Sequence, residues 1–135
     1  MYHETTNDIM VSVMPVYIDE KSTPEKDIYF WAYRVTIKNK SKNNVQLISR
    51  YWRISDALGR VEEVEGEGVI GEQPILEPDA HFEYTSGCPL TTTSGIMVGT
   101  YTMINIDKEN KPGAPFKINI PAFSLDIPDA DHIIN

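Results

Sequence analysis

Apolar and polar residues alternate with a period of two along most of this chain, and turn signals separate the alternating segments. This pattern is typical of antiparallel β-sheets that place one face against a core. The alternation is clearest at residues 27–39, where one face carries five large apolar side chains: Tyr29, Trp31, Tyr33, Val35 and Ile37. We expect these five side chains, Trp31 included, to lie in the core.

Further strands are expected at residues 8–18, 45–56, 61–65, 80–86, 96–106 and 116–120, and the last apolar pattern continues to Leu125. In residues 45–56 the alternation groups Val45 with Leu47 and Tyr51, and Ile48 with Trp52 and Ile54. In residues 96–106 it predicts an alternating stripe that runs from Ile96 and Val98 to Ile106. Helical periodicity is almost absent, so the chain is expected to be all-β.

The 135 residues amount to one domain, with enough chain to bury a core without disulfides or metals. About seven or eight short strands leave a sandwich or a small barrel, and we favour the sandwich. No Cys-Trp-Cys set is present, which excludes a disulfide-pinned antibody domain, whereas an immunoglobulin-like sandwich of the fibronectin type III kind needs no such bridge. We expect residues 8–125 to be ordered within the single domain 1–135, and both ends to be frayed.

The charge balance argues against binding to a nucleic-acid duplex. The chain has 20 acidic and 12 basic residues and a formal net charge of −8, whereas duplex affinity depends on Lys and Arg at phosphates. The basic stretch at residues 38–42 is predicted to be a turn between strands. The single cysteine, Cys88, and the lack of a leader-like or membrane-length apolar stretch predict a cytoplasmic protein that does not enter membranes.

One glycine motif could bind a ligand. Residues 66–71 match G-x-G-x-x-G, the dinucleotide fingerprint, which binds a pyrophosphate at the N-terminus of the helix that follows it. Here Pro74 and Pro78 follow the motif, so no such helix is expected. A nest of backbone amides could still hold a phosphate, although Glu65, Glu67 and Glu72 would repel it unless a divalent cation bridges them. The alternative is a surface loop whose glycines serve positive φ angles or close packing.

No catalytic residue and no metal site is expected. The three histidines are scattered, the serines lie outside a nucleophile elbow, and no activating base accompanies Cys88. One cysteine and dispersed histidines lack zinc-ligand spacing, and the acidic turn after residue 106 lacks the length of a calcium loop. We therefore expect no cofactor and no enzymatic activity.

Four motifs in order between residues 52 and 125 resemble the ApaG (CorD) family. They are GEGVIGEQP at residues 66–74, FEYTSGCPL at 82–90, GIMVGTYTM at 95–103 and IPAFSL at 120–125. The resemblance implies a fibronectin type III-like sandwich, an association with cobalt and magnesium tolerance, and a protein-binding role. Where the family usually has Pro-Gly-Glu, this chain has Asp79 in the middle position, which we expect in the left-handed region that Asp tolerates.

Two functions remain open at this point. The first is a non-enzymatic protein-interaction or regulatory module, as a monomer or homodimer with a protein partner. The second is a small-molecule sensor that binds a nucleotide polyphosphate or pyrophosphate group at residues 66–71, with a divalent cation. Both use the same predicted loop and its neighbouring strand: Gly66, Glu67, Gly68, Val69, Ile70, Gly71, Glu72, Gln73, Tyr84 and Ser86.

Overall fold

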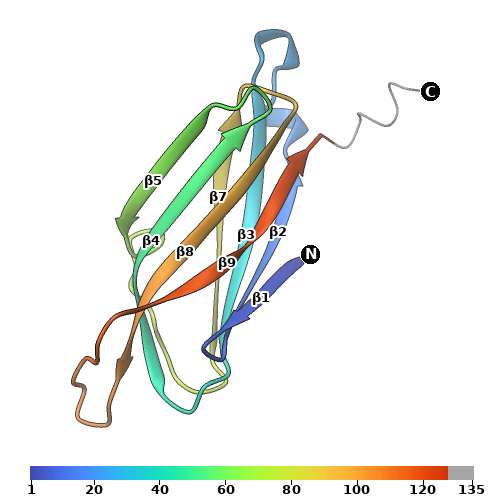
Figure 1. Cartoon of the computed structure of the whole chain (residues 1–135). Coiled ribbons are helices and arrows are strands. Elements are labelled where there is room, and N and C mark those ends of the chain that lie inside the picture. The colour runs from blue at the N-terminus through green and yellow to red at the C-terminus, as the bar shows by residue number, and fades with distance from the viewer. Residues whose placement is uncertain (128–135) are drawn as a thin grey trace.

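The computed structural model describes residues 1–127, and within this range the chain forms nine β-strands and two short 3-10 helices (Figure 1). The strands are β1 (Tyr2–Thr6), β2 (Ile9–Tyr17), β3 (Tyr29–Asn39), β4 (Asn44–Asp56), β5 (Val61–Glu67), β6 (Ile75–Leu76), β7 (His81–Leu90), β8 (Ser94–Ile106) and β9 (Phe116–Asp126). The 3-10 helices are η1 (Asp19–Lys21) and η2 (Pro24–Lys26). The expected frayed C-terminal end lies largely outside the described residues. No helix in the described range is long and apolar enough to cross a membrane.

The strands form two antiparallel sheets, as the alternation predicts. The first sheet has the order β1-β2-β3-β7, and the second has the order β5-β4-β8-β9 with the short β6 also paired to β4. The predicted turn at residues 38–42 connects β3 to β4 and so carries the chain from one sheet to the other. Asn39 organises this turn, because its buried side-chain amide donates to the carbonyls of Asn43 (2.7 Å) and Leu76 (2.9 Å).

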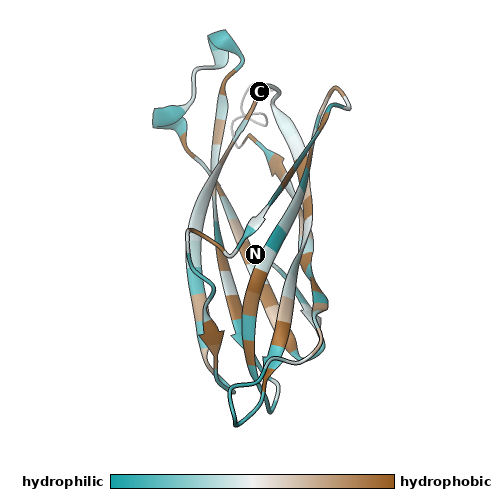
Figure 2. Cartoon of the chain, turned by 90° about the vertical axis from the view of Figure 1, so that its left-hand side faces the viewer, coloured by the Kyte–Doolittle hydropathy of each residue, from teal (hydrophilic) through white to brown (hydrophobic). Residues whose placement is uncertain are grey.

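The core lies between the sheets and follows the alternation of β3. All five apolar residues predicted on that face are buried, and Trp31 is 4% exposed. Figure 2 shows hydrophobic and hydrophilic residues alternating along the strands. Trp52 of β4 joins the two layers, because its ring meets Tyr33 edge-on at 5.4 Å and Phe123 at 5.8 Å between centroids.

The expectation of a frayed N-terminal end is wrong, since residues 2–6 form β1 and pair with β2 in register from Tyr2 opposite Val13 to Thr6 opposite Ile9. The turn between them contains Asn7 and Asp8, both with positive φ (49° and 63°). A two-residue turn of this kind is the standard connection of a tight hairpin. The polar composition of β1 hid this strand in the sequence.

A bulge changes the predicted faces of β4. The pairing with β8 shifts between Leu47 and Ser49, so Ile48 is an extra residue. Extra residues reverse the alternation that follows them. As a result Trp52 is buried like Leu47, whereas Tyr51, predicted with Leu47, is only half-buried.

The predicted stripe on β8 faces outward. Ile96 is 52% exposed and Val98 is 36% exposed, whereas Met97, Tyr101 and Met103 on the opposite face are buried. Both faces of this strand carry apolar residues, so alternation could not decide between them. The pairing of β8 with β9 also shifts between Met97 and Gly99, close to a proline of β9 that lacks an amide donor.

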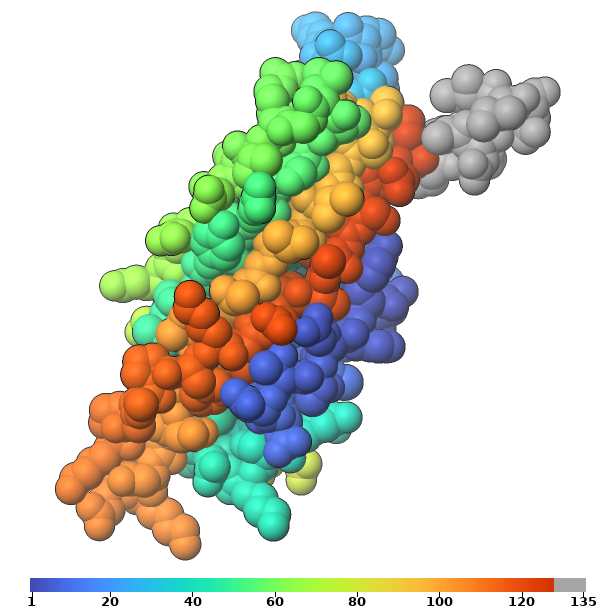
Figure 3. All heavy atoms as spheres, viewed as in Figure 1, coloured from blue at the N-terminus to red at the C-terminus, as the bar shows by residue number. Residues whose placement is uncertain are grey.

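The two long sides of the sandwich differ. On one side β1 packs against β9, where Tyr2 and Ser124 share a hydrogen bond of 3.0 Å and Asn119 donates to Glu4 at 3.0 Å. Figure 3 shows β1 lying along β9 on this side. On the other side the end strands are β5 and β7, and no described strand pairs with the outer edge of either. We call this the open side.

Candidate functional site

The glycine loop follows β5 as a tight turn. Val69 and Glu72 exchange two backbone hydrogen bonds of 2.8 and 2.9 Å around Ile70 and Gly71. Both central residues have positive φ, 48° and 75°, which is the geometry of a two-residue hairpin turn. Val69 is fully buried and anchors the turn in the core, while Ile70 at its tip is 62% exposed. The loop opens no helix, in agreement with the prolines that follow it.

Several backbone groups of the loop are already engaged. The amide of Gly68 donates to the carbonyl of Ile48 at 2.8 Å, and the amides of Val69 and Glu72 donate to each other's carbonyls. The side chain of Gln73 donates to the same Ile48 carbonyl at 2.9 Å. These three loop amides are therefore committed to backbone acceptors.

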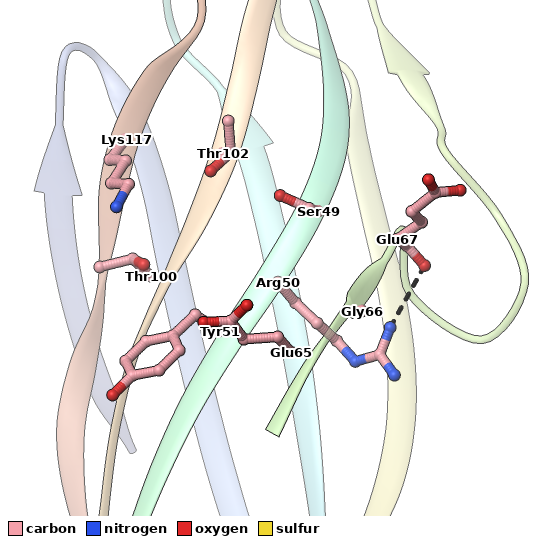
Figure 4. Close-up of a pocket in the computed structure, with 9 residues that line it drawn as sticks. All are labelled: Ser49, Arg50, Tyr51, Glu65, Gly66, Glu67, Thr100, Thr102 and Lys117. Carbon is pink, nitrogen blue, oxygen red and sulfur yellow. Dashed lines mark hydrogen bonds between the residues drawn. The ribbon is translucent and has the colours of Figure 1, made fainter. Parts of the chain in front are cut away.

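The side chain of Arg50 of β4 reaches across β5 to Glu67, where the loop begins (Figure 4). It is paired in register with Gly66, and its Nη1 donates to the carbonyls of Gly68 (2.8 Å) and Glu67 (3.3 Å). A Cβ on Gly66 would lie only 2.8 Å from the guanidinium, so this glycine makes room for the arginine. The loop thus presents carbonyl oxygens to a cation.

Arg50 was absent from the predicted site, although β4 contains a signal for it. It lies at alternate positions with Trp52 and Ile54, and all three line the space between the sheets on the open side. A charged residue within an inward-facing apolar stripe is uncommon without a partner. No carboxylate of the described residues forms an ion pair with Arg50.

A broad polar pocket of about 510 Å³ lies over β4, β5, β8 and β9 (Figure 4). Hydroxyl groups dominate its floor, two glutamates of β5 lie on one side, and one lysine of β9 lies on the other. Its lining residues are Ser49, Arg50, Tyr51, Glu65, Gly66, Glu67, Thr100, Thr102 and Lys117. Of the predicted site, only Gly66 and Glu67 contribute to it.

Tyr84 and Ser86 lie on β7 in the other sheet, across the open side from β5. Tyr84 is buried, and its hydroxyl forms a short hydrogen bond with the hydroxyl of buried Tyr101. Burial raises the pKa of Tyr84 and of Tyr101, and the Arg50 guanidinium opposes both shifts. The hydroxyl pair therefore stays protonated near neutral pH and joins the two sheets.

Ser86 lies on the wall of a second, smaller pocket that opens between β5 and β7. This cleft has a volume of about 240 Å³, and Tyr33, Arg50, Trp52, Glu62 and Cys88 also line it. Burial raises the pKa of Tyr33, while the Ser86 hydroxyl and the Arg50 charge oppose that shift. The structure thus brings Ser86 near Arg50, while the tip of the glycine loop at Ile70 does not line the cleft.

Cys88 lies within β7 and is 4% exposed. Burial, with a smaller contribution from Glu62, raises the pKa of its thiol to about 11. A buried thiol of this kind is a poor nucleophile at neutral pH. Among the described residues, no three His, Cys, Asp or Glu side chains are placed to share a metal ion.

The raised pKa of Cys88 predicts a loss of stability in alkali. The unfolded thiol ionises near pH 8.5 and the folded thiol near 11, so the contribution is complete below about pH 8.5 and is lost as the pH rises toward 11. Between pH 7.5 and 9.5 the wild type should lose about 1 kcal/mol more stability than Cys88→Ala. Urea unfolding in the presence of a reductant measures the free energy of unfolding of both proteins at each pH. An equal loss with rising pH in the two proteins would contradict a raised pKa for Cys88.

Comparisons with known proteins agree with this structure. A family model described as the ApaG domain matches residues 19–105. "Protein ApaG" of Brucella anthropi is 55% identical over 135 residues and that of Brucella suis biovar 1 is 53% identical, each covering all of both chains. A Bordetella pertussis protein, solved as ApaA, superposes with a TM-score of 0.83 at 46% identity, covering 90% of this chain and 94% of that one.

A more distant solved structure, the C-terminal domain of wzt, shares the fold alone. It superposes with a TM-score of 0.53 at 7% identity, covering 93% of this chain and 76% of that one. Asp79, which stands where the family usually has glycine, has a φ of 68°, in the left-handed region expected for its position in the turn. On the family model and the full-length relatives together, the chain belongs to the ApaG family.

Proposed function

We propose that this protein is a non-enzymatic interaction module that binds an extended segment of a protein partner along the outer edge of β7. The observation that carries the proposal is the open side of the sandwich, where neither β5 nor β7 has a partner strand among the described residues. An exposed strand edge offers unpaired backbone donors and acceptors to a further strand.

The composition of the two edges favours β7 over β5. Four of the seven residues of β5 are glutamates, and charged residues of this kind protect an edge from pairing. By contrast, β7 carries no charged side chain from Tyr84 to Leu90. A partner strand would therefore meet less electrostatic resistance at β7.

The pairing of β7 with β3 indicates which groups face the free edge. The carbonyl of Ala80 accepts from the amide of Asn39 of β3, and bonding toward one neighbour alternates along an antiparallel strand. The backbone groups of Glu83, Thr85 and Gly87 consequently face away from β3. Pro89 also lies at one of these alternate positions, so the amide hydrogen that proline lacks would not have bonded to β3.

The nucleotide-sensor alternative has weaker support. The amides of Gly68, Val69 and Glu72 already donate to backbone carbonyls, whereas a phosphate nest requires amides directed at the ligand. Glu65 and Glu67 also lie beside the loop, where they line the broad polar pocket over β4, β5, β8 and β9. We therefore assign the glycine loop a structural role, in which its carbonyls position Arg50.

The edge of β7 can be tested with one pair of variants. Thr85→Pro removes an edge amide without removing a β3 hydrogen bond, and Thr85→Ala shortens the same side chain while it keeps the amide. Affinity capture from a bacterial lysate should give at least one protein that the wild type and Thr85→Ala retain and that Thr85→Pro loses. Thermal unfolding of the two variants controls for loss of the fold.

Hydrogen exchange gives a second measurement that needs no variant. The amides of Thr85 and Gly87 should exchange fast in the free protein and become protected when the captured partner is added. Unchanged exchange at both amides in the complex would overturn the proposal. Sedimentation of the wild type and Thr85→Pro identifies the case in which the added strand belongs to a second copy of this chain.

A further inference from the structure

The cleft between β5 and β7 contains a cation that no described side chain neutralises. Nη1 of Arg50 uses its two hydrogens on the carbonyls of Glu67 and Gly68. No described residue accepts a hydrogen bond from Nε or Nη2, and the side chain is half-buried. A guanidinium held by neutral carbonyls keeps its full charge, and its free Nε–Nη2 edge can donate two parallel hydrogen bonds.

The surroundings of Arg50 add further hydrogen-bonding groups. The hydroxyls of Tyr33 and Ser86 line the same cleft from the opposite sheet. The charge of Arg50 acts favourably on the ionised forms of Tyr33 and Tyr84, which places the guanidinium within electrostatic range of both. The cleft therefore offers a fixed cation and nearby hydroxyls to an acceptor group.

The other walls limit which anion fits. The rings of Tyr33 and Trp52 and the side chains of Met97 and Pro89 give the cleft an apolar body. Its volume of about 240 Å³ lies below that of pockets for drug-sized ligands. An apolar group about the size of one amino-acid side chain matches this space.

The charge pattern of the cleft favours a ligand with a single negative charge. Among the described residues, Arg50 is the one cation that lines the cleft. Glu62 lines its far end opposite Ile54, whose backbone lies four residues, or about 13 Å, along β4 from that of Arg50. A single negative charge at Arg50 is balanced by the guanidinium, whereas further negative charges would approach Glu62. A carboxylate therefore matches the single positive charge of Arg50 better than a polyphosphate does.

We propose that the cleft between β5 and β7 binds the carboxylate of a ligand with an apolar body, through Arg50 with Tyr33 and Ser86 on the opposite wall. The carboxylate comes either from a free small acid or from the C-terminus of a chain paired with β7. Only this second source rests on the proposed function, because the cleft itself does not depend on the β7 edge.

The test is an NMR titration of the labelled protein with hydrocinnamate and with its neutral isostere hydrocinnamide. Hydrocinnamate should saturate shifts of Tyr33, Ser86 and the Arg50 Nε–H with a dissociation constant on the order of 1 mM, and hydrocinnamide should bind at least about tenfold more weakly. Equal binding of the two compounds, or no saturation by hydrocinnamate up to about 20 mM, would overturn the proposal.

Variants separate Arg50 from general charge effects. Arg50→Gln should weaken hydrocinnamate about tenfold or more, whereas Arg53→Gln, on the exposed outer face of the same strand, should leave the affinity unchanged. Equal losses in the two variants would refute the assignment to Arg50. Because Arg50 also holds the loop, Arg50→Lys keeps the charge and should retain part of the affinity if the fold is intact.

A peptide arm distinguishes the two sources of the carboxylate. A hexapeptide that ends in phenylalanine with a free carboxylate should bind better than its amidated form. The carboxylate comes from a chain terminus if two results are found together. The free-acid peptide must bind at least about tenfold better than hydrocinnamate, and Thr85→Pro must abolish only this additional affinity of the peptide. If the peptide gains nothing over hydrocinnamate, the source is a free acid, and the β7 proposal is tested separately by its own variants.

Discussion

Replacing Trp52 with alanine is expected to lower the free energy of unfolding by about 3–5 kcal/mol. Trp52 is 3% exposed and contacts aromatic rings from both sheets, Tyr33 at 5.4 Å and Phe123 at 5.8 Å between centroids. The substitution leaves a cavity between the layers and removes two edge-on aromatic contacts. The free energy of unfolding of a domain of this size is about 5–15 kcal/mol, so the variant should be close to unfolding at room temperature.

Urea unfolding followed by far-ultraviolet circular dichroism measures this loss without relying on tryptophan fluorescence. Arg53→Ala is the matched control, because the next residue of β4 points outward and is exposed. It should change stability by no more than about 0.5 kcal/mol. A loss below about 1.5 kcal/mol for Trp52→Ala would contradict the position of this ring as the contact between the sheets.

Alternation predicted the parts of the fold in which only one face of a strand is apolar. On β3 the inward face carries aromatic and branched residues while the outward face becomes polar. The alternation alone therefore predicted that every second residue from Tyr29 to Ile37 is buried. On β8 both faces are apolar, and the choice between Ile96 and Met97 depends on which face meets the other sheet. Which face of β8 meets the other sheet depends on tertiary packing, and the alternation of residues within one strand cannot predict it.

Bulges limit prediction in the same way. One extra residue at Ile48 changes the face of every later residue in β4, and the local sequence carries no distinct sign of it. This is also why the role of Arg50 was missed. Its inward direction becomes clear only when Trp52 is known to be in the core, and its contact with Gly66 depends on the register of β5.

The candidate site was predicted in part. The glycine loop and Ser86 were identified from sequence motifs, and the structure places part of the loop and Ser86 on either side of Arg50. Tyr84 and Val69 belong to the core instead, at 8% and 0% exposure. A motif marks residues that are constrained, but burial decides whether the constraint comes from packing or from a ligand.

Replacing Gly68 with alanine is expected to cost about 2–4 kcal/mol and to release the glycine loop. Gly68 has a φ of 62°, and a Cβ there would collide with the backbone carbonyl oxygen of Glu72. That carbonyl accepts the amide of Val69, so relief of the collision breaks the turn and withdraws Val69 from the core.

Gly71→Ala separates the collision from the backbone conformation. Gly71 also has a positive φ, 75°, but a Cβ there would meet no atom within 4 Å. It should therefore cost only the conformational penalty of about 1–2 kcal/mol. Urea unfolding of both variants gives the comparison, and amide exchange at Val69 reports whether the turn has opened. Equal losses would mean that positive φ alone explains both glycines, and the close approach of Gly68 to Glu72 would then have no part in holding the loop over Arg50.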